Sequence, residues 1–260
     1  MNCVVMAGGR PESHESLFTL TMGGPKACLE IGKKSVLEWV IAALQEAPSI
    51  EKILVVGLDE QADLTFQKPV QWLPAKDSLI ANGLAAVDWI QQNWVEESPV
   101  LFCGGDIPAI NGTIVERFIE ECQPFDKAIY YPMVRQEDME RRFPGSQRTF
   151  VRFSGQSLAG GDMIIARPEL VQENRELLDS LVQGRKHAWK IARMIGPLTL
   201  VRFLLRRLSI DDVEETAARL LGQPVEVVLS HDAELAMDLD KPEHFAILRA
   251  ELEPSEPSHQ

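Results

Sequence analysis

The chain has 260 residues, of which 45% are hydrophobic and 25% are charged. This composition is ordinary for a globular protein, so it excludes disorder, collagen-like repeats and a coiled coil. Twenty-six Lys and Arg residues stand against 39 Asp and Glu residues, which gives a formal net charge of −13. A chain this acidic has no overall electrostatic reason to bind nucleic acid or an anionic membrane, and we expect no nucleic-acid partner.

The cysteines and the apolar stretches indicate a soluble, cytoplasmic protein. The N-terminus has no basic region of the kind that opens a signal peptide. The longest apolar stretch, 195–205, is interrupted by Arg202 and is far shorter than the roughly 20 residues that cross a bilayer. Neither a zinc site nor a disulfide framework is indicated, because no C-x-x-C pair occurs among the cysteines, which are Cys3, Cys28, Cys103 and Cys122.

The first half of the chain alternates short apolar runs with segments of helical period. Strands are predicted where Val, Ile and Leu cluster, at 2–7, 52–57, 70–73 and 100–104. Capping-box patterns beginning at Ser35 and Thr113 predict two helix starts, and 78–92 has apolar residues at helical spacing. This alternation predicts a parallel sheet wrapped by helices, whose ligands collect at the carboxyl ends of the strands.

The second half is less regular. A strand is predicted at 127–134, followed by an excursion over 135–157 where a substrate-specific insertion could sit. A helix from Pro168 to near Gly184 and further helices up to Gly222 come next. The remaining predictions are strands at 225–229 and 236–239, a last helix from Pro242 and a frayed tail over 253–260.

A glycine-rich segment follows the first predicted strand. Gly8 and Gly9 come directly after it, and Gly23-Gly24-Pro25-Lys26 follows a polar loop. Glycines let backbone N–H groups approach a phosphate closely, and a lysine adds a point charge. The alternative is an ordinary Gly-rich loop. The segment lacks the third glycine of a dinucleotide-binding fingerprint and the Gly-Lys-Ser/Thr ending of a Walker loop.

Four motifs in order resemble the MobA-like NTP transferases, a nucleotidyltransferase family. They are Ala7-Gly8-Gly9, then 25–38 beginning Pro-Lys, then Gly105-Asp106-Ile107-Pro108, then 237–243 with Asp238 and Asp240. The resemblance implies a three-layer α/β fold with a mostly parallel twisted sheet, helices on both faces and a C-terminal helical insertion. It also implies a single domain over 1–252, with a nucleotide-binding half at 1–122, an acceptor-side half at 123–252, an insertion at about 184–222 and a flexible tail at 253–260.

The same resemblance assigns roles to single residues. Lys26 would stabilise charge as the α-phosphorus is attacked, and Asp106 would be catalytic and hold Mg²⁺. Asp240 would be the second metal ligand, with Asp238 as its substitute. The nucleotide and acceptor would be contacted by Ala7, Gly8, Gly9, Arg10, Ser78, Asn82, Gly83 and Gly161. Apart from the resemblance, Asp106 could be a turn cap, and Asp238 or Asp240 could cap the helix that begins at Pro242.

The implied reaction is transfer of a nucleoside monophosphate from an NTP to a phosphate-bearing acceptor such as a sugar phosphate, a cofactor or an alcohol phosphate, with release of pyrophosphate. Such chemistry needs alignment and charge neutralisation, for which Mg²⁺ held by one or two carboxylates is suited. Alternatives are a metal-dependent glycosyltransferase, because Asp238-Leu239-Asp240 matches a D-x-D pattern, and a non-catalytic nucleotide-binding regulator. The regulator is suggested by the loop after Gly9, where Arg10 is the only arginine and the family usually has one farther along.

Basic charge is concentrated between 184 and 210. Seven basic residues and no acidic residue occur there, and Lys186, Lys190 and Arg193 share one face of a predicted helix. The alternatives are a solvated helix face, recognition of an acceptor phosphate and contact with a membrane surface. The sequence does not indicate an oligomeric state.

Overall fold

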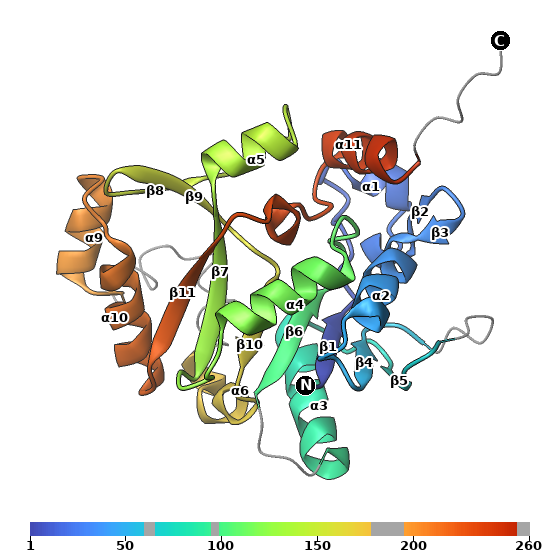
Figure 1. The fold of residues 1–260 in the computed structure, drawn as a ribbon, viewed down its shortest axis with the longest axis horizontal. Helices are drawn as coiled ribbons and strands as arrows, with labels where there is room; N and C mark the ends of the chain where they lie inside the picture. Colours follow the sequence, from blue (N-terminus) through green and yellow to red (C-terminus); the bar gives the residue numbers. More distant parts are fainter. Residues whose placement is uncertain (60–65, 95–98, 178–194, 254–260) are drawn as a thin grey trace.

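The computed structural model describes residues 1–59, 66–94, 99–177 and 195–253, built around a twisted sheet of nine strands (Figure 1). The strand order is β5-β4-β1-β6-β10-β7-β9-β8, and β11 pairs with β7. One half of the sheet is parallel, and its strands are β1 (Cys3–Met6), β4 (Ile53–Val56), β5 (Val70–Leu73) and β6 (Val100–Gly104). These four strands lie where the apolar runs predict them.

The other half of the sheet is mixed. β10 (Met163–Ala166) runs antiparallel between β6 and β7 (Ile129–Arg135), and β11 (Val225–Ser230) runs parallel to β7. β9 (Gln156–Gly160) continues along β7 beyond the end of β10 and forms a hairpin with β8 (Val151–Phe153). Since β7 is parallel to β6, its carboxyl end points to the same edge of the sheet as the ends of β1 and β6.

Helices cover both faces of the sheet, as predicted. Alternate side chains of β1 point to opposite faces of the sheet. Cys3 and Val5 belong to the core on the face covered by α2 (Val36–Glu46) and α4 (Gly112–Glu121). Val4 packs on the other face, with α3 (Leu79–Asn93). Figure 1 shows α2 and α4 together in front of the sheet. The strands are buried on both sides, which explains their continuous apolar sequences.

A smaller core forms under the carboxyl-terminal helices. α10 (Ile210–Leu221) packs against β11, and Ile210 and Val213 join a cluster with Met133, Leu158 and Leu208. α9 (Pro197–Leu204) precedes it, and α6 (Glu169–Glu173) follows β10. Gly222 ends α10 in the left-handed conformation that glycine adopts most readily. The predicted helix start at Pro168 is confirmed, but α6 ends at Glu173 and does not run on without a break to near Gly184, because Asn174 leaves the helical conformation. Residues 178–194 lie outside the described residues.

The two predicted capping boxes differ in outcome. Ser35 caps α2 by accepting a hydrogen bond from the Glu38 N–H at 3.2 Å, and the Ser35 N–H donates to the Glu38 carboxylate at 2.6 Å, as predicted. The prediction for Thr113 is wrong, because Asn111 caps α4 by accepting from the Ile114 N–H at 3.0 Å. The carboxylate of Glu116 instead accepts a hydrogen bond from the Ser49 hydroxyl at 2.7 Å.

Other expectations need correction. The predicted strand at 236–239 is wrong: a 3₁₀ turn, η2 (Ala233–Ala236), leads into an irregular segment that carries the two aspartates to α11 (Pro242–Leu252). The excursion at 135–157 holds α5 (Gln136–Arg142) as well as β8. Short elements also occur at α1 (Phe18–Thr21), η1 (Lys26–Cys28), β2 (Glu30–Ile31) and β3 (Lys34–Ser35). Within the described ranges, every helix is too short or too polar to span a bilayer.

Candidate active site

Three segments that are far apart in sequence meet at one edge of the sheet. β1 and β6 are parallel neighbours, with Met6 opposite Gly104, so the residues that follow both strands emerge together. The Gly105 N–H donates to the Met6 carbonyl oxygen at 3.0 Å. The Leu239 N–H donates to the carbonyl oxygen of Asp106 at 2.9 Å. The first glycine motif, the Gly-Asp motif and the last acidic motif therefore form one site.

Close backbone packing explains the glycines of the first motif. Gly57 has a φ of +102°, and a Cβ there would lie 2.4 Å from the Cα of Gly8. A Cβ on Gly8 would lie 3.0 Å from the Cα of Gly57, and one on Gly105 would lie 2.9 Å from the Cα of Ala7. Gly9 differs, because no protein atom lies within 4 Å of the position of its Cβ. Gly8 is held by packing, whereas Gly9 borders open space.

Lys26 lies between two of the predicted aspartates. Its backbone N–H donates to the Gly9 carbonyl oxygen at 2.9 Å, which returns the chain to the first motif after the long loop. Its Nζ lies 3.4 Å from Oδ2 of Asp106 and also contacts Oδ1 of Asp240. Burial alone would lower the pKa of Lys26, but the two carboxylates outweigh it and raise that pKa above its ordinary value. Lys26 is therefore a fixed positive charge.

The two carboxylates beside Lys26 have different surroundings. Burial raises the pKa of Asp106 despite the opposing effect of Lys26. Burial also acts against ionisation of Asp240, but the hydrogen bond and charge of Lys26 hold its pKa below the ordinary value. Asp240 does not cap α11, because Lys241 occupies that position and makes no side-chain cap. The side chain of Asp240 is half exposed, so it is the more open of the two to a ligand.

Asp238 is a partner of Arg148. The two side chains form an ion pair in which Arg148 is 13% exposed and Asp238 is 10% exposed. The oxygens of Asp106, Asp238 and Asp240 nevertheless come within 4.8 Å of one another. Arg148 was not singled out from the sequence, since it lies in the irregular stretch between α5 and β8 and no local pattern predicts its position.

Asp162 is a further acidic group; it belongs to the Gly160-Gly161-Asp162 segment, which resembles the acceptor-side strand edge of the family, but no role was predicted for its carboxylate. It directly precedes β10, and its carbonyl oxygen accepts a hydrogen bond from the Gly104 N–H at 2.7 Å. Burial, helped by the negative charge of Asp106, raises the pKa of Asp162 to about 7. Tyr131 lies nearby: burial and then the charge of Asp162 raise its pKa. The Gly160-Gly161-Asp162 motif is the sequence signal that could have identified Asp162.

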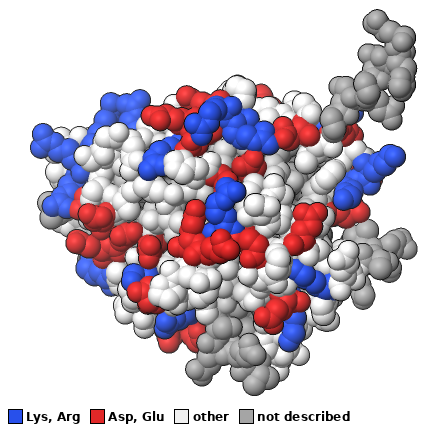
Figure 2. Space-filling model, viewed as in Figure 1, with Lys and Arg blue, Asp and Glu red and all other residues white. Residues whose placement is uncertain are grey.

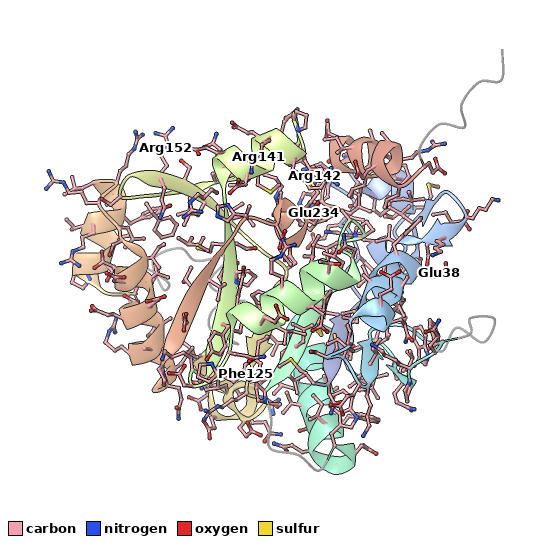
Figure 3. All side chains as sticks on the ribbon, in the orientation of Figure 1. Glu38, Phe125, Arg141, Arg142, Arg152 and Glu234 are labelled. Atoms are coloured by element: carbon pink, nitrogen blue, oxygen red, sulfur yellow. The ribbon has the colours of Figure 1, made fainter. Side chains whose placement is uncertain are left out.

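η2 and α11 fix the last acidic motif in place. Arg142 of α5 donates from Nε to the Glu234 carboxylate of η2 at 2.7 Å and also pairs with Glu251 of α11 (Figure 3). His244 of α11 is buried, and its two ring nitrogens lie 2.8 Å from the carbonyl oxygens of Asp238 and Ser146. The acidic motif is thus held on both sides by side chains from distant elements.

The motifs of this site lie in a region that matches a known protein family. Residues 3–208 match the family described as the MobA-like NTP transferase domain, and this range covers most of the chain. The chain belongs to the MobA-like NTP transferase family. This family is a nucleotidyltransferase family, and the resemblance stated from the motifs is confirmed. No curated protein sequence matches the chain significantly.

Solved structures share the fold of this MobA-like NTP transferase. A hypothetical transferase from Thermus thermophilus is 29% identical with a TM-score of 0.76, covering 94% of this chain and 98% of its own. A CMP:2-keto-3-deoxy-manno-octonic acid synthetase complexed with CTP is 14% identical with a TM-score of 0.56, covering 96% and 98%. The 4-diphosphocytidyl-2C-methyl-D-erythritol synthase of Anaerococcus prevotii is 10% identical with a TM-score of 0.60, covering 97% and 95%. The latter two show the fold alone.

The residues predicted to contact the base and ribose are on or beside α3 of this MobA-like NTP transferase. Ser78 is the N-cap of α3 and accepts from the Ala81 N–H at 3.1 Å. Asn82 is buried and accepts from the Lys76 N–H at 2.7 Å. Its amide nitrogen would lie 3.1 Å from a Cβ on Gly8, which links α3 to the glycine motif. Gly83 has open space around its Cβ position.

Arg10 and Gly161 have local structural contacts. Arg10 Nη1 lies 3.4 Å from the Gly23 carbonyl oxygen, across the mouth of the long loop. Gly161 donates its N–H to the Pro132 carbonyl oxygen at 2.9 Å, and a Cβ there would lie 3.0 Å from the carbonyl oxygen of Leu235. Its lack of a side chain permits η2 to approach the sheet.

The basic residues near the carboxyl terminus are only partly described. Lys186, Lys190 and Arg193 lie outside the described residues. Arg202 pairs with Asp212, and Arg206 and Arg207 are exposed. On the face shown in Figure 2, Lys and Arg are interspersed with Asp and Glu.

The acidic site fits a divalent cation. Four carboxyl groups, from Asp106, Asp162, Asp238 and Asp240, face two basic side chains, Lys26 and Arg148. Two oxygens on opposite sides of one Mg²⁺ are about 4 Å apart, and the oxygens of Asp106, Asp238 and Asp240 all lie within 4.8 Å of one another. Asp106 and Asp240 fit best, because these two carboxylates share a single cationic partner, Lys26, whereas Asp238 has Arg148 as a partner of its own.

Proposed function

We propose that this protein transfers a nucleoside monophosphate from an NTP to a phosphate-bearing small molecule and releases pyrophosphate, with Mg²⁺. The observation that supports the proposal is the contact of Lys26 with both Asp106 and Asp240, which are far apart in sequence. A conserved fold alone would not require a lysine and two carboxylates to meet above the glycine motif.

The chemistry needs alignment and charge neutralisation more than covalent catalysis. The acceptor oxygen must lie in line with the α-phosphorus, and negative charge on the departing pyrophosphate must be stabilised. Lys26 supplies a positive charge: its backbone is bonded to Gly9, and its Nζ is held in place by Asp106 and Asp240. A charge fixed before the reaction needs little reorganisation in the transition state, so Lys26 acts chiefly on the rate.

The glycine motif and α3 would bind the nucleotide. The open space beside Gly9 lets its backbone approach the triphosphate. Asn82 fixes the backbone at Lys76 and contacts the Gly8 region, so it would position the base-binding segment together with Ser78 and Gly83. Ala7 and Arg10 would complete the loop around the phosphates, with Arg10 released from the weak contact to the Gly23 carbonyl.

Asp106 and Asp240 would hold the Mg²⁺, and Asp238 would keep its pairing with Arg148. Mg²⁺ supplies charge neutralisation and orientation of the phosphate oxygens when it is bound. Arg148, Tyr131 and Gly161 border the site on the mixed half of the sheet, so the acceptor would enter from that side.

The test uses the intact protein, α-labelled NTPs, Mg²⁺ and a small-molecule extract of the cells that contain the protein. We expect the label of at least one NTP to move into a product other than the nucleoside monophosphate, with release of one pyrophosphate per product. Asp106→Asn must abolish this transfer. If all four labels stay in the NTPs, or move equally with Asp106→Asn, the proposal is wrong.

A further inference from the structure

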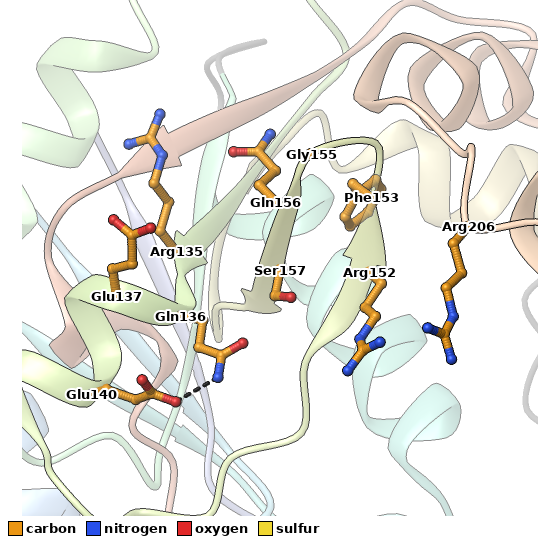
Figure 4. A pocket seen from close by; sticks show the side chains of 10 residues that line it. All are labelled: Arg135, Gln136, Glu137, Glu140, Arg152, Phe153, Gly155, Gln156, Ser157 and Arg206. Carbon is orange, nitrogen blue, oxygen red and sulfur yellow. Dashed lines mark hydrogen bonds between the residues drawn. The ribbon is translucent and has the colours of Figure 1, made fainter.

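A second polar pocket lies outside the aspartate site, between α5, the β8–β9 hairpin and the residues after α9. Its volume is about 520 Å³, which lies in the range of small-molecule sites. Three arginines from three different elements line it: Arg135 at the end of β7, Arg152 in β8 and Arg206 (Figure 4). Gln156 and Ser157 also line it, and the Ser157 hydroxyl lies on the same side of the hairpin as Arg152 (Figure 4).

The arginines of this pocket have no carboxylate partner among the described residues. Some arginines of the described chain do pair with Asp or Glu, namely Arg117, Arg141, Arg142, Arg148, Arg202 and Arg249, whereas others, among them Arg167 and Arg175, form no ion pair there. In a chain with a net charge of −13, acidic partners are plentiful. What sets this pocket apart is that two unpaired guanidinium groups, those of Arg152 and Arg206, come from different elements and line the same space.

The acidic side chains of the pocket do not neutralise these charges. Glu137 and Glu140 also line it, but the Glu140 carboxylate accepts a hydrogen bond from the amide of Gln136. In Figure 4, Arg152 and Arg206 point the same way, and the Glu140 carboxylate is turned to the Gln136 amide. Like charges that face a common space repel each other, and a bound anion removes this repulsion.

We propose that this pocket binds the phosphate group of a phosphorylated small molecule through Arg152 and Arg206, with Ser157 as a hydroxyl donor. A guanidinium group stays protonated and presents its donors in a planar fork that fits phosphate oxygens. Arg135 is not part of this pair, because its side chain points away from Arg152 and Arg206 in Figure 4. Phe153 and the backbone of Gly155 supply a rigid wall at the hairpin end.

This site is separate from the one that holds the reacting phosphates. Ser157 and Asp162 are five residues apart along an extended segment, which corresponds to roughly 16 Å at about 3.3 Å per residue. A phosphate held by Arg152 is therefore too far from Lys26 to be attacked there. Binding in the pocket does not depend on the proposed transfer reaction.

The test is a titration of the intact protein with inorganic phosphate, followed by the backbone amide signals in nuclear magnetic resonance spectra. We expect saturable shifts at Gly155, Gln156 and Ser157, with at least a tenfold weaker affinity in the double variant Arg152→Gln/Arg206→Gln. Arg167→Gln/Arg175→Gln removes two other arginines that lack a carboxylate partner in the described chain and should leave the affinity unchanged.

Two further arms identify the source of the signal. Lys26→Met must leave the shifts at Gly155–Ser157 intact, because phosphate bound at the triphosphate site would depend on Lys26. A phosphate monoester and acetate, titrated separately, distinguish a phosphate site from a general anion site. The proposal is overturned if the shifts do not saturate, if they occur only near Gly9, if acetate binds as tightly, or if both double variants behave alike.

Discussion

The backbone N–H of Leu239 donates to the carbonyl oxygen of Asp106 at 2.9 Å and so joins the last acidic motif to the end of β6. Leu239 is fully buried, and Asp238 and Asp240 flank it on the chain. This one hydrogen bond therefore sets how far Asp240 lies from Asp106. The acidic cluster depends on backbone geometry as well as on the carboxylates themselves.

Asp106→Asn and Asp240→Asn should each lower the turnover of the proposed transfer by more than about 100-fold. Loss of a side chain that only hydrogen-bonds to a metal ligand already lowers activity by up to about that factor, and loss of the ligand itself should lower it further. Both variants should keep the far-ultraviolet circular dichroism of the native chain, since asparagine has the same shape. Turnover at saturating Mg²⁺ is the measurement. Full activity in Asp240→Asn would remove Asp240 from the metal site.

Asp238→Asn should act on stability more than on activity. It leaves the charge of Arg148 largely buried without its partner, and breaking such a pair typically costs about 3–5 kcal/mol. Urea denaturation measures the free energy of unfolding. The double variant Asp238→Asn/Arg148→Met should recover part of the loss, and a double variant as unstable as the sum of both single variants would contradict a direct pairing.

Lys26→Met should reduce turnover more than NTP affinity. Methionine keeps much of the buried stem but removes the charge that meets the transition state. Steady-state kinetics with varied NTP separates the two effects. An unchanged turnover at saturation, with only weaker binding, would show that Lys26 acts as a ground-state anchor.

Asp162 should make the metal-free protein less stable as the pH rises. Its pKa is about 7 in the folded chain and ordinarily 3.8, so the folded state holds an extra proton between these values. The stabilisation is present at about pH 4 and is lost as the pH rises through 7. Urea denaturation with EDTA should therefore find Asp162→Asn more stable than the native protein at pH 8, with the difference shrinking toward pH 4. A difference independent of pH would contradict the assignment.

Gly9→Ala should weaken NTP binding without destabilising the fold. No protein atom lies within 4 Å of the added Cβ, so the free energy of unfolding should change by less than about 0.5 kcal/mol. The methyl group would occupy the space where the triphosphate approaches the loop, and we expect at least a tenfold higher Kd. Gly57→Ala is the contrast: its positive φ and its collision with Gly8 should lower stability as well. Native NTP affinity in Gly9→Ala would place the triphosphate elsewhere.

The regular elements were predictable because their signals are local. The continuous apolar runs gave the four parallel strands, and the capping box at Ser35 gave the start of α2. Asn111 displaced Thr113 as the cap of α4 because Glu116 is engaged by Ser49 of a distant segment. The segment 236–239 is apolar enough for a strand, but its residues pack around Asp106 as an irregular connection.

The site was predictable in part. Lys26, Asp106 and Asp240 follow ordered motifs, and the sequence placed them together at the edge where parallel strands end. Arg148 could not be predicted, since its pairing with Asp238 joins two irregular segments. The charge state of Asp162 depends on burial and on Asp106, and neither is visible in the motif that contains it.

Calorimetric titration of each NTP into the intact protein, with Mg²⁺ and then with EDTA, is the most direct test of the site. We predict that at least one NTP binds once per chain with Mg²⁺, and that EDTA or Asp106→Asn weakens this binding at least tenfold. Absence of binding by all four NTPs, or binding that is indifferent to both EDTA and Asp106→Asn, would contradict a metal-assisted nucleotide site at Asp106 and Asp240.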